Sequence, residues 1–417
     1  NLIHSCLNAT YPPAHPRESG NPETGLWVAA FAGTSENPCN TMPLDLTAEF
    51  SRFRNADPDR LHFAAHSHAY WPDVTREAQI AVWDAWEDYK ANPWAVAWTA
   101  GGRRLLVTHA GTHELSVIDA PGLLARLAAA QDPSDDLKFL LGLRKRIPLK
   151  GNGPRAMAVH GERVWVAGYF SNTVETLPLD AGHAQPRVIA QLPSGSPSAV
   201  RRGEMLFNDG SICFQGWQSC ATCHSPDGRV DGLNWDLLND GIGNPKNSKS
   251  LLLSHRTPPA MSQGVRESAE MAVRSGLRVI LFTRAAEEDA AAIDQYLKSL
   301  RPLPSPALAG GKLSAAAQRG RALFMSPQTQ CASCHPPGLY TDLKAYDVGT
   351  RAATDSVSEF DTPTLVELWR TAPYLHDGSA ATLREVLTTS NRGDKHGRTS
   401  HLTPAQIEDL VEFLRSL

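Results

Sequence analysis

Two copies of one short motif constrain this 417-residue chain more than any other feature. Each copy places two cysteines three positions apart and a histidine directly after the second, in Cys220-Ala-Thr-Cys223-His224 and Cys331-Ala-Ser-Cys334-His335. A shuffled chain of this composition would contain about 0.004 such matches, so two are not accidental. Two thiols can form thioethers to the vinyl groups of a porphyrin, and the adjacent histidine can ligate its iron. The motifs therefore predict two covalently bound haem c groups.

The same four cysteines allow a second interpretation. Two Cys-x-x-Cys pairs about 110 positions apart could supply four thiolates to a structural zinc ion. Each pair is followed at once by the histidine that an iron needs, and this favours haem. We therefore expect His224 and His335 to be the proximal iron ligands and the four motif cysteines to hold the porphyrins. Three of the seven cysteines remain, namely Cys6, Cys39 and Cys213, and they allow at most one disulfide.

The bulk composition excludes several classes of partner. With 40 Lys plus Arg against 44 Asp plus Glu, the chain has no excess of positive charge for nucleic acid or for an anionic membrane surface. No run of 18 apolar residues predicts a transmembrane segment, and the first residues lack the pattern of a signal peptide. We expect a soluble chain that is either mature or incomplete.

The first 92 residues divide into two segments without a clear function. Residues 1–41 are rich in Pro, Asn, Ser and Gly, and we expect an irregular leader. Residues 42–92 predict a helical segment, with Asp73 as its cap and apolar residues at helical spacing after it. This segment resembles the opening of class V aminotransferases and kynureninases over about 50 residues, without a cofactor domain after it. A fused or wrongly joined gene fragment is the alternative, and His66 and His68 fit a polar loop.

Residues 93–192 show the pattern of short antiparallel strands. Two stretches, 93–119 and 154–180, each give three strands separated by turns rich in Gly, Asn or Ser. They are typical of β-propeller blades. A closed propeller needs at least four blades, so this one is truncated or its other blades are not recognisable. Its exposed edge strands would invite pairing with another chain.

The C-terminal half repeats itself after a linker at 193–200. The string RGEMLF (202–207) precedes the first motif and RGRALF (319–324) precedes the second, and similar amphipathic helices at 291–300 and 407–417 close the two units. We therefore expect two mostly α-helical cytochrome c domains, at 195–302 and 312–417. The fold class is multidomain, with partial β-propeller blades followed by these two haem domains.

Residues 195–417 also resemble a known family. The string FDTPTLVELWRTAPYLHDGSAATLREV (360–386), the stretch NPKNSKSL (244–251) and the tandem motifs are similar to bacterial dihaem cytochrome c peroxidases and their relatives that mature a tryptophan-derived quinone cofactor. The resemblance implies a peroxidatic N-terminal haem, an electron-relaying C-terminal haem, a calcium ion between them and a periplasmic location. A cell-surface or secreted location fits the same pattern.

The first haem site departs from the family. Family members can cap this haem with a histidine, but residues 227–243 contain none, so the haem is open or capped by His255. The family's Gln and Glu pair aligns with Met271 and a position near Leu281. Glu267 and Glu270 are the nearby catalytic candidates, although they also fit the solvated face of a helix. The family's aromatic residue between the haems is missing, which leaves Trp217 and Trp235 as distant candidates.

The second haem site departs as well. Where relatives have a Met or Tyr ligand, this chain has Ser390, which is a poor iron ligand. His396 and His401 follow in a Gly-containing loop, and we expect one of them, with His396 favoured, to be the sixth ligand. The alternative is that both are polar loop residues. His376 is expected to make a structural hydrogen bond, for example to a haem propionate.

These observations favour an enzyme, a dihaem oxidoreductase of the cytochrome c peroxidase type. Hydrogen peroxide, another oxidant or a partner would react at haem one, and electrons would pass through haem two to or from a small cytochrome or copper protein. One alternative is an electron-transfer cytochrome with two six-coordinate irons. The other is a surface binding protein whose propeller recognises a partner and carries the haems to it.

Overall fold

The computed structural model describes residues 92–129, 138–179, 185–193, 195–216, 218–225, 227–236 and 244–417. The predicted leader at 1–41 and all but the last residue of the predicted helical segment at 42–92 lie outside these ranges. The same holds for Cys6, Cys39, His66, His68, Asp73 and Trp217. Within the described ranges, no helix is both long and apolar enough to cross a membrane.

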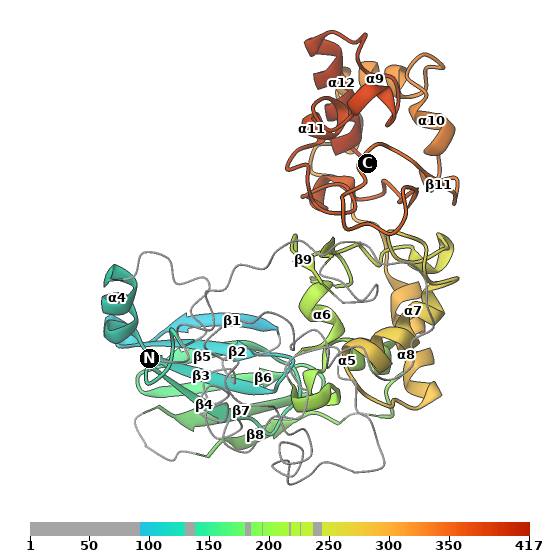
Figure 1. Cartoon of the computed structure of the whole chain (residues 1–417). Coiled ribbons are helices and arrows are strands. Elements are labelled where there is room, and N and C mark those ends of the chain that lie inside the picture. Colours follow the sequence, from blue (N-terminus) through green and yellow to red (C-terminus); the bar gives the residue numbers. More distant parts are fainter. Residues whose placement is uncertain are drawn as a thin grey trace, which may run out of the picture. The chain divides into compact units, whose positions relative to one another are not determined.

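Two four-stranded antiparallel sheets form the first part of the described chain (Figure 1). The first sheet consists of β1 (Pro93–Trp98), β2 (Arg104–His109), β3 (Glu114–Asp119) and β4 (Arg144–Pro148). The second consists of β5 (Pro154–His160), β6 (Arg163–Gly168), β7 (Thr173–Pro178) and β8 (Arg187–Gln191). Both sheets are meanders in which each strand pairs with the next one in the sequence.

The pattern found three strands of each sheet and missed the fourth. β4 reads RKRIP and β8 reads RVIAQ, and both lie at the edge of their sheet. Both are five residues long and show little apolar alternation. Leu106, Leu115 and Val164 are fully buried in a core shared by the two sheets. Whether the sheets are blades of a larger propeller stays a prediction. A short helix, α4 (Ala120–Ala129), follows β3.

The predicted cytochrome c domains at 195–302 and 312–417 are called the first and second haem units. The first haem unit is built on one helix crossing. Its helices are α5 (Ala199–Asn208), α6 (Cys220–Cys223), α7 (Ala269–Ser275) and α8 (Glu287–Ser299), and a π-helical turn, η6 (Gly276–Ile280), follows α7. A side chain at Gly203 of α5 would place its Cβ 1.9 Å from the carbonyl oxygen of Ala292 in α8. The glycine of the repeated Arg-Gly therefore lets the two helices approach closely.

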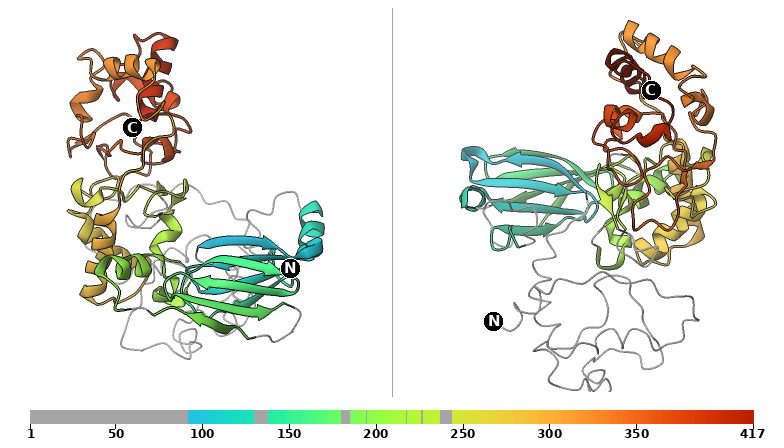
Figure 2. Two further views of the ribbon diagram at one scale, coloured as in Figure 1. Left: turned by 180° about the vertical axis from the view of Figure 1, so that it is seen from behind. Right: turned by 45° about the horizontal axis from the view of Figure 1, so that its top comes forward.

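The second haem unit repeats this arrangement. Its helices are α9 (Ala315–Phe324), α10 (Cys331–Cys334), α11 (Leu383–Leu387) and α12 (Pro404–Arg415), and α9 packs on α12 (Figure 2). A Cβ at Gly320 would lie 1.8 Å from the carbonyl oxygen of Asp409. The repeated strings RGEMLF and RGRALF thus mark two helix crossings that pack in the same way.

Each unit also contains a two-stranded ladder and a short 3-10 turn. The ladders join β9 (Asn234–Trp235) to β10 (Lys246–Asn247) and β11 (Ala345–Tyr346) to β12 (Phe360–Asp361). The turns are η5 (Ser254–Arg256) and η7 (Leu368–Arg370), and each follows a residue with left-handed backbone. The loops around the two motifs therefore share one fold.

Candidate haem sites

The first attachment helix presents its histidine to a backbone carbonyl. α6 is one turn long, so Cys220 and Cys223 lie on one side of it and His224 follows directly. The Nδ1 atom of His224 lies 3.0 Å from the carbonyl oxygen of Lys249. A carbonyl only accepts hydrogen bonds, so Nδ1 carries the hydrogen and Nε2 keeps its lone pair. Burial lowers the pKa of His224, which keeps the ring neutral.

The second attachment helix has the same chemistry with a different start. The Nδ1 atom of His335 lies 2.7 Å from the carbonyl oxygen of Tyr340, and burial lowers the pKa of this histidine too. α10 begins after Gln330, whose backbone is left-handed and whose side chain makes no capping bond. At the start of α6, by contrast, the Ser219 amide donates to Thr222 Oγ1 over 2.9 Å. Both histidines are thus oriented as iron ligands.

The motif cysteines are separate, half-buried thiols. The five described cysteines form no disulfide among themselves. Burial raises the pKa of Cys220 to about 12 and also raises the pKa of Cys331. Among the described residues, no group of three or more His, Cys, Asp and Glu side chains is arranged to hold a metal ion. A zinc site of four thiolates is therefore not formed, whereas thioethers to two separate porphyrins fit these positions.

Several buried donors fit the acidic edge of a porphyrin. Within residues 195–417, three buried side-chain donors have no hydrogen-bond partner among the described residues, namely Gln263 Nε2, Thr350 Oγ1 and Trp369 Nε1. Buried donors are almost always satisfied, so each points to a missing acceptor. A haem propionate is a carboxylate and offers only acceptors. The donors agree with the neutral histidines and half-buried thiols in fitting bound haem.

His396 is the predicted ligand that lies nearest to a proximal histidine. Its ring centroid lies 6.5 Å from that of His335, and the two ring planes form an angle of 46°. Burial and the neighbouring His335 lower the pKa of His396 to about 4, so its ring is neutral. Asn391 Oδ1 accepts from the His396 amide over 2.8 Å, and the Arg398 amide donates to the Thr329 carbonyl over 2.8 Å. The loop is thus fixed on both sides of His396.

The other predicted sixth ligands lie elsewhere. His255 Nε2 lies 3.0 Å from Asp294 Oδ1, and its Nδ1 lies 3.4 Å from Ser254 Oγ. The His255 and Asp294 side chains are 4% and 5% exposed, so this pair is a buried structural contact. His401 is exposed. Ser390 is half-buried, and its amide donates to the Glu385 carbonyl.

The two acidic candidates lie on the outside of the first unit. Glu270 forms an ion pair of 2.9 Å with Lys298, and this bond lowers the pKa of Glu270 to about 2. Glu267 is exposed. Met271 is 47% exposed, whereas Leu281 is buried in the core of the unit. Among the described residues, no hydrogen bond or ion pair joins either glutamate to His224, and a catalytic role for them stays a prediction.

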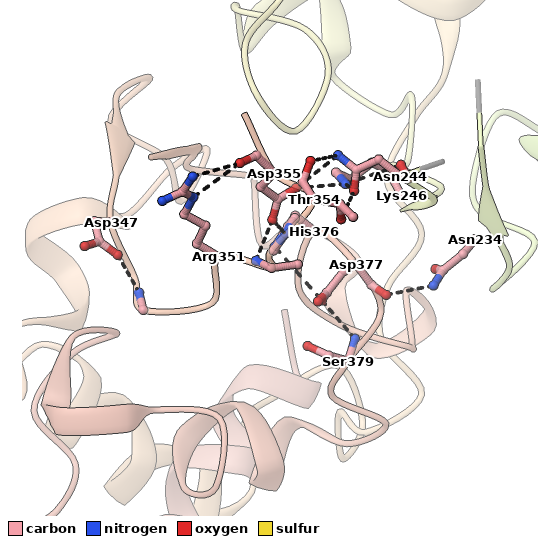
Figure 3. Close-up of polar contacts among 12 residues, drawn as sticks. Asn234, Asn244, Lys246, Asp347, Arg351, Thr354, Asp355, His376, Asp377 and Ser379 are labelled. Atoms are coloured by element: carbon pink, nitrogen blue, oxygen red, sulfur yellow. Dashed lines mark hydrogen bonds and ion pairs between the residues drawn. The ribbon is translucent and has the colours of Figure 1, made fainter. Parts of the chain in front are cut away.

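A buried polar network joins the two haem units (Figure 3). Asp355 lies at its centre with a side chain that is fully buried, and it accepts from Lys246 Nζ and His376 Nε2, each over 2.9 Å. Asn244 Nδ2 donates to the Thr354 carbonyl over 3.1 Å. The ring of His376 stacks on Phe360 with 3.8 Å between the centroids. His376 thus makes the structural hydrogen bond that the sequence suggested, to a carboxylate of the chain.

Comparisons with known proteins agree with this geometry. The family model described as RoxA-like, cytochrome c-like matches residues 360–396. Hydrazine synthase subunit gamma of Kuenenia stuttgartiensis is 32% identical over 272 residues, which cover 52% of this chain and 77% of that protein. Methylamine utilization protein MauG of Methylorubrum extorquens is 26% identical, with 53% of this chain and 78% of that protein covered. Cytochrome-c peroxidases match at 23–26% identity.

A solved structure shows the same likeness. Hydrazine synthase of Kuenenia stuttgartiensis, pressurised with 20 bar xenon, superposes with a TM-score of 0.51 at 28% identity, covering 56% of this chain and all of that chain. The chain belongs to the dihaem cytochrome c peroxidase family. Proteins of this family are oxidoreductases with covalently bound haem c, and the neutral histidines and half-buried thiols of this chain fit that cofactor.

One buried side-chain oxygen in the first haem unit has no partner among the described residues. Asn247 Oδ1 is buried in this way, while the amide nitrogen of Asn247 donates to the Pro373 carbonyl. Sequence reasoning did not single out Asn247, although it lies in the NPKNSKSL stretch. Sequence reasoning also missed Lys246 and Asp355, because burial between the two haem units leaves no local pattern in the sequence.

Proposed function

We propose that this chain is a periplasmic or cell-surface dihaem oxidoreductase that reduces peroxide, or oxidises a partner, at its first haem site and passes electrons through its second. The observation that carries the proposal is the pair of half-buried, neutral histidines, each with Nδ1 bonded to a backbone carbonyl. A c-type haem held at each place supplies one-electron chemistry. The residues of the chain then decide what each site does.

At the second site, His335 and His396 would hold the iron between them. A histidine nitrogen lies about 2 Å from a metal that it ligates, so two rings on one iron have centres roughly 6 Å apart. The observed centroid distance of 6.5 Å supports this assignment. Two strong ligands exclude substrate and leave electron transfer as the role of this site.

At the first site, His224 would be the proximal ligand. His255, the sixth-ligand candidate nearest to this site in the sequence, is engaged by Asp294 and Ser254, which supports an accessible iron. Glu267 is exposed and Glu270 is paired with Lys298, so within the described ranges neither glutamate is engaged as an acid/base group at His224. Such groups typically contribute about 10² to 10⁴ in rate. We therefore expect slow but measurable reaction with peroxide.

The ion pair of Lys249 and Asp361 would fix the position of the first haem site relative to the second. The Lys249 carbonyl holds His224, while its ammonium forms an ion pair of 2.6 Å with Asp361, whose side chain is 3% exposed. Calcium at Asn247 would tie the same two segments, since the Asn247 amide also reaches Pro373. A small cytochrome or copper protein is the proposed electron partner.

The test combines cyanide binding with stopped-flow mixing of the reduced holoprotein and hydrogen peroxide. We expect cyanide to bind one ferric haem per chain and peroxide to oxidise the protein slowly. Absence of cyanide binding, together with absence of peroxide oxidation, would contradict the proposal. That result would identify the chain as an electron-transfer cytochrome with two six-coordinate irons.

A further inference from the structure

Two residues at the ends of sheet strands reach out of the sheets toward the first haem unit. Asn92 precedes β1 and His113 precedes β3, and both have left-handed backbone, with φ of 58° and 57°. This conformation is uncommon outside glycine, although Asn and His tolerate it better than most residues. It directs both side chains away from the strands they precede, onto segments that flank the first haem motif.

Asn92 contacts the start of the first attachment helix. Its amide nitrogen donates to Ser219 Oγ over 2.9 Å and to the Asn208 carbonyl over 3.1 Å. Ser219 is the residue that precedes Cys220 and opens α6, and it is 2% exposed. Asn92 is itself 9% exposed. A buried residue of the sheets therefore fixes the point from which the haem-binding turn begins.

His113 makes a second contact, and its hydrogen bonds define which ring nitrogen carries the hydrogen. The Gly153 amide donates to His113 Nδ1 over 3.0 Å, so Nδ1 carries no hydrogen. Nε2 then carries it and donates to Asp209 Oδ1 over 3.2 Å. Asp209 in turn accepts from the Ser211 amide over 2.8 Å and opens the turn that leads toward Cys213. The Gly210 amide donates to the Gly111 carbonyl beside it over 2.8 Å.

An arginine that stacks on aromatic rings of the sheets also contacts the first haem unit. The Arg155 guanidinium lies 4.1 Å from the Trp94 ring centroid and 4.3 Å from that of Tyr169, one ring from each sheet. It also forms an ion pair of 3.2 Å with Glu204 of α5. Such stacked cations are worth about 0.5–2 kcal/mol. The two sheets and α5 are thus held as one body around the start of the first haem unit.

We propose that the two sheets border the first haem site and that Asn92 and His113 are positioning residues for it. By fixing α6, these two residues set the properties of haem one alone. The proposal rests on the proposed function in that it assumes two haems. Outer-shell contacts orient iron ligands, and they tune the potential of the metal. At the start of α10, the Gln330 carbonyl accepts from Ser333 Oγ of the same turn, so this start is held from within its own unit, whereas the start of α6 is held by Asn92.

The test uses the complete holoprotein and treats haem two as the internal reference. Asn92→Gly keeps a residue suited to left-handed backbone and removes the amide, and His113→Gly does the same for the imidazole. Each should speed amide hydrogen exchange at 218–225 by about tenfold, the factor for one lost buried hydrogen bond, and leave exchange at 329–336 unchanged. Spectroelectrochemistry should show a shifted potential for haem one and an unshifted potential for haem two.

Two further variants separate positioning from general damage to the sheets. His113→Gln places an amide nitrogen where Nε2 donates, so it should restore both the slow exchange and the potential of haem one. Glu162→Gln weakens the ion pairs of Glu162 with Arg103 and Arg104, which lie within the sheets, and should change neither readout. Equal shifts of both haems, or no shift of haem one with unchanged exchange at 218–225, would overturn the proposal. A chain with one haem would instead refute the proposed function, while the exchange data remained interpretable.

Discussion

The two haem units use one fold and differ in what lies opposite the proximal histidine. Each has a glycine at its helix crossing, a one-turn attachment helix and a histidine whose Nδ1 bonds a carbonyl. In the second unit, the His396 ring lies 6.5 Å from that of His335. In the first, the nearby His255 is held by Asp294. We therefore propose that the motif determines haem attachment, whereas the loops outside the motif determine the reactivity of each haem.

The equivalent turns η5 and η7 show how such a difference arises. His255 is the second residue of η5 and Trp369 is the second residue of η7. His255 has both ring nitrogens engaged within its own unit, whereas the Trp369 Nε1 donor is buried without a partner among the described residues. The equivalent position therefore carries a structural histidine in the first unit and a hydrogen-bond donor without a described partner in the second.

The largest expected effect comes from removing one motif at a time. Cys331→Ser combined with Cys334→Ser should lower the haem content from two to one per chain in a pyridine haemochrome assay, because both thioethers of one site are lost. Cys213→Ser should retain two haems, since that buried cysteine lies outside the motifs. Loss of both haems, or of neither, from the double variant would show that the two units do not bind haem separately.

The comparison predicts that a single histidine distinguishes the two irons. His396→Ala should convert haem two from low to high spin in the ferric optical spectrum, because Ser390 offers no strong ligand. His401→Ala is the matched control, since His401 lies in the same loop and is exposed. An unchanged spectrum in the His396 variant would remove the main difference between the two sites.

The link between the units can be broken at a buried ion pair. Arg229 and Glu367 have side chains 6% and 1% exposed, with 2.9 Å between Nη2 and Oε1. Arg229→Leu should destabilise the holoprotein by up to about 3–5 kcal/mol, because it removes both hydrogen bonds of the guanidinium from a buried carboxylate and leaves only Arg370 at 3.6 Å. Denaturant unfolding measures this effect, and Arg319→Ala, which breaks an exposed pair with Asp409, should change stability little. Equal effects of the two variants would contradict the importance of the junction.

The smallest effect concerns acid stability. Burial raises the pKa of Asp355, but its bonds to Lys246, the Ala352 amide and His376 outweigh burial and hold the pKa to about 2. A lowered folded-state pKa stabilises the protein above the unfolded value of about 4, and this contribution, on the order of 2 kcal/mol, is lost as the pH falls from about 4 to 2. Asp355→Asn should therefore lose less stability over this range in urea unfolding. The exposed control Glu359→Gln should follow the unmodified protein.

Local patterns predicted the attachment motifs and the repetition of one helical unit. Cys220 and Cys331 belong to a contiguous motif, and the Arg-Gly repeat indicated two related units, in which the structure shows close helix approach at Gly203 and Gly320. Strand alternation found six of the eight strands in the two four-stranded sheets. It missed β4 and β8, because RKRIP and RVIAQ are short and show little apolar alternation.

Long-range contacts could not be predicted in the same way. The bond between Asn92 and Ser219 joins residues 127 positions apart, and the pair Arg229 and Glu367 spans 138 positions. Neither residue type nor spacing identifies such partners. The same limit applied to His255, since its engagement by Asp294 depends on how α8 packs on the loop that carries it.

Electron paramagnetic resonance of the resting ferric holoprotein, with spin quantification per chain, tests the central claim most directly. The account predicts one low-spin signal typical of two histidine ligands and one high-spin signal of equal intensity, because His396 lies opposite His335 and His255 is engaged by Asp294. The low-spin signal should disappear in His396→Ala while the original high-spin signal remains. Two low-spin signals in the unmodified protein, or a low-spin signal that survives in His396→Ala, would contradict the account.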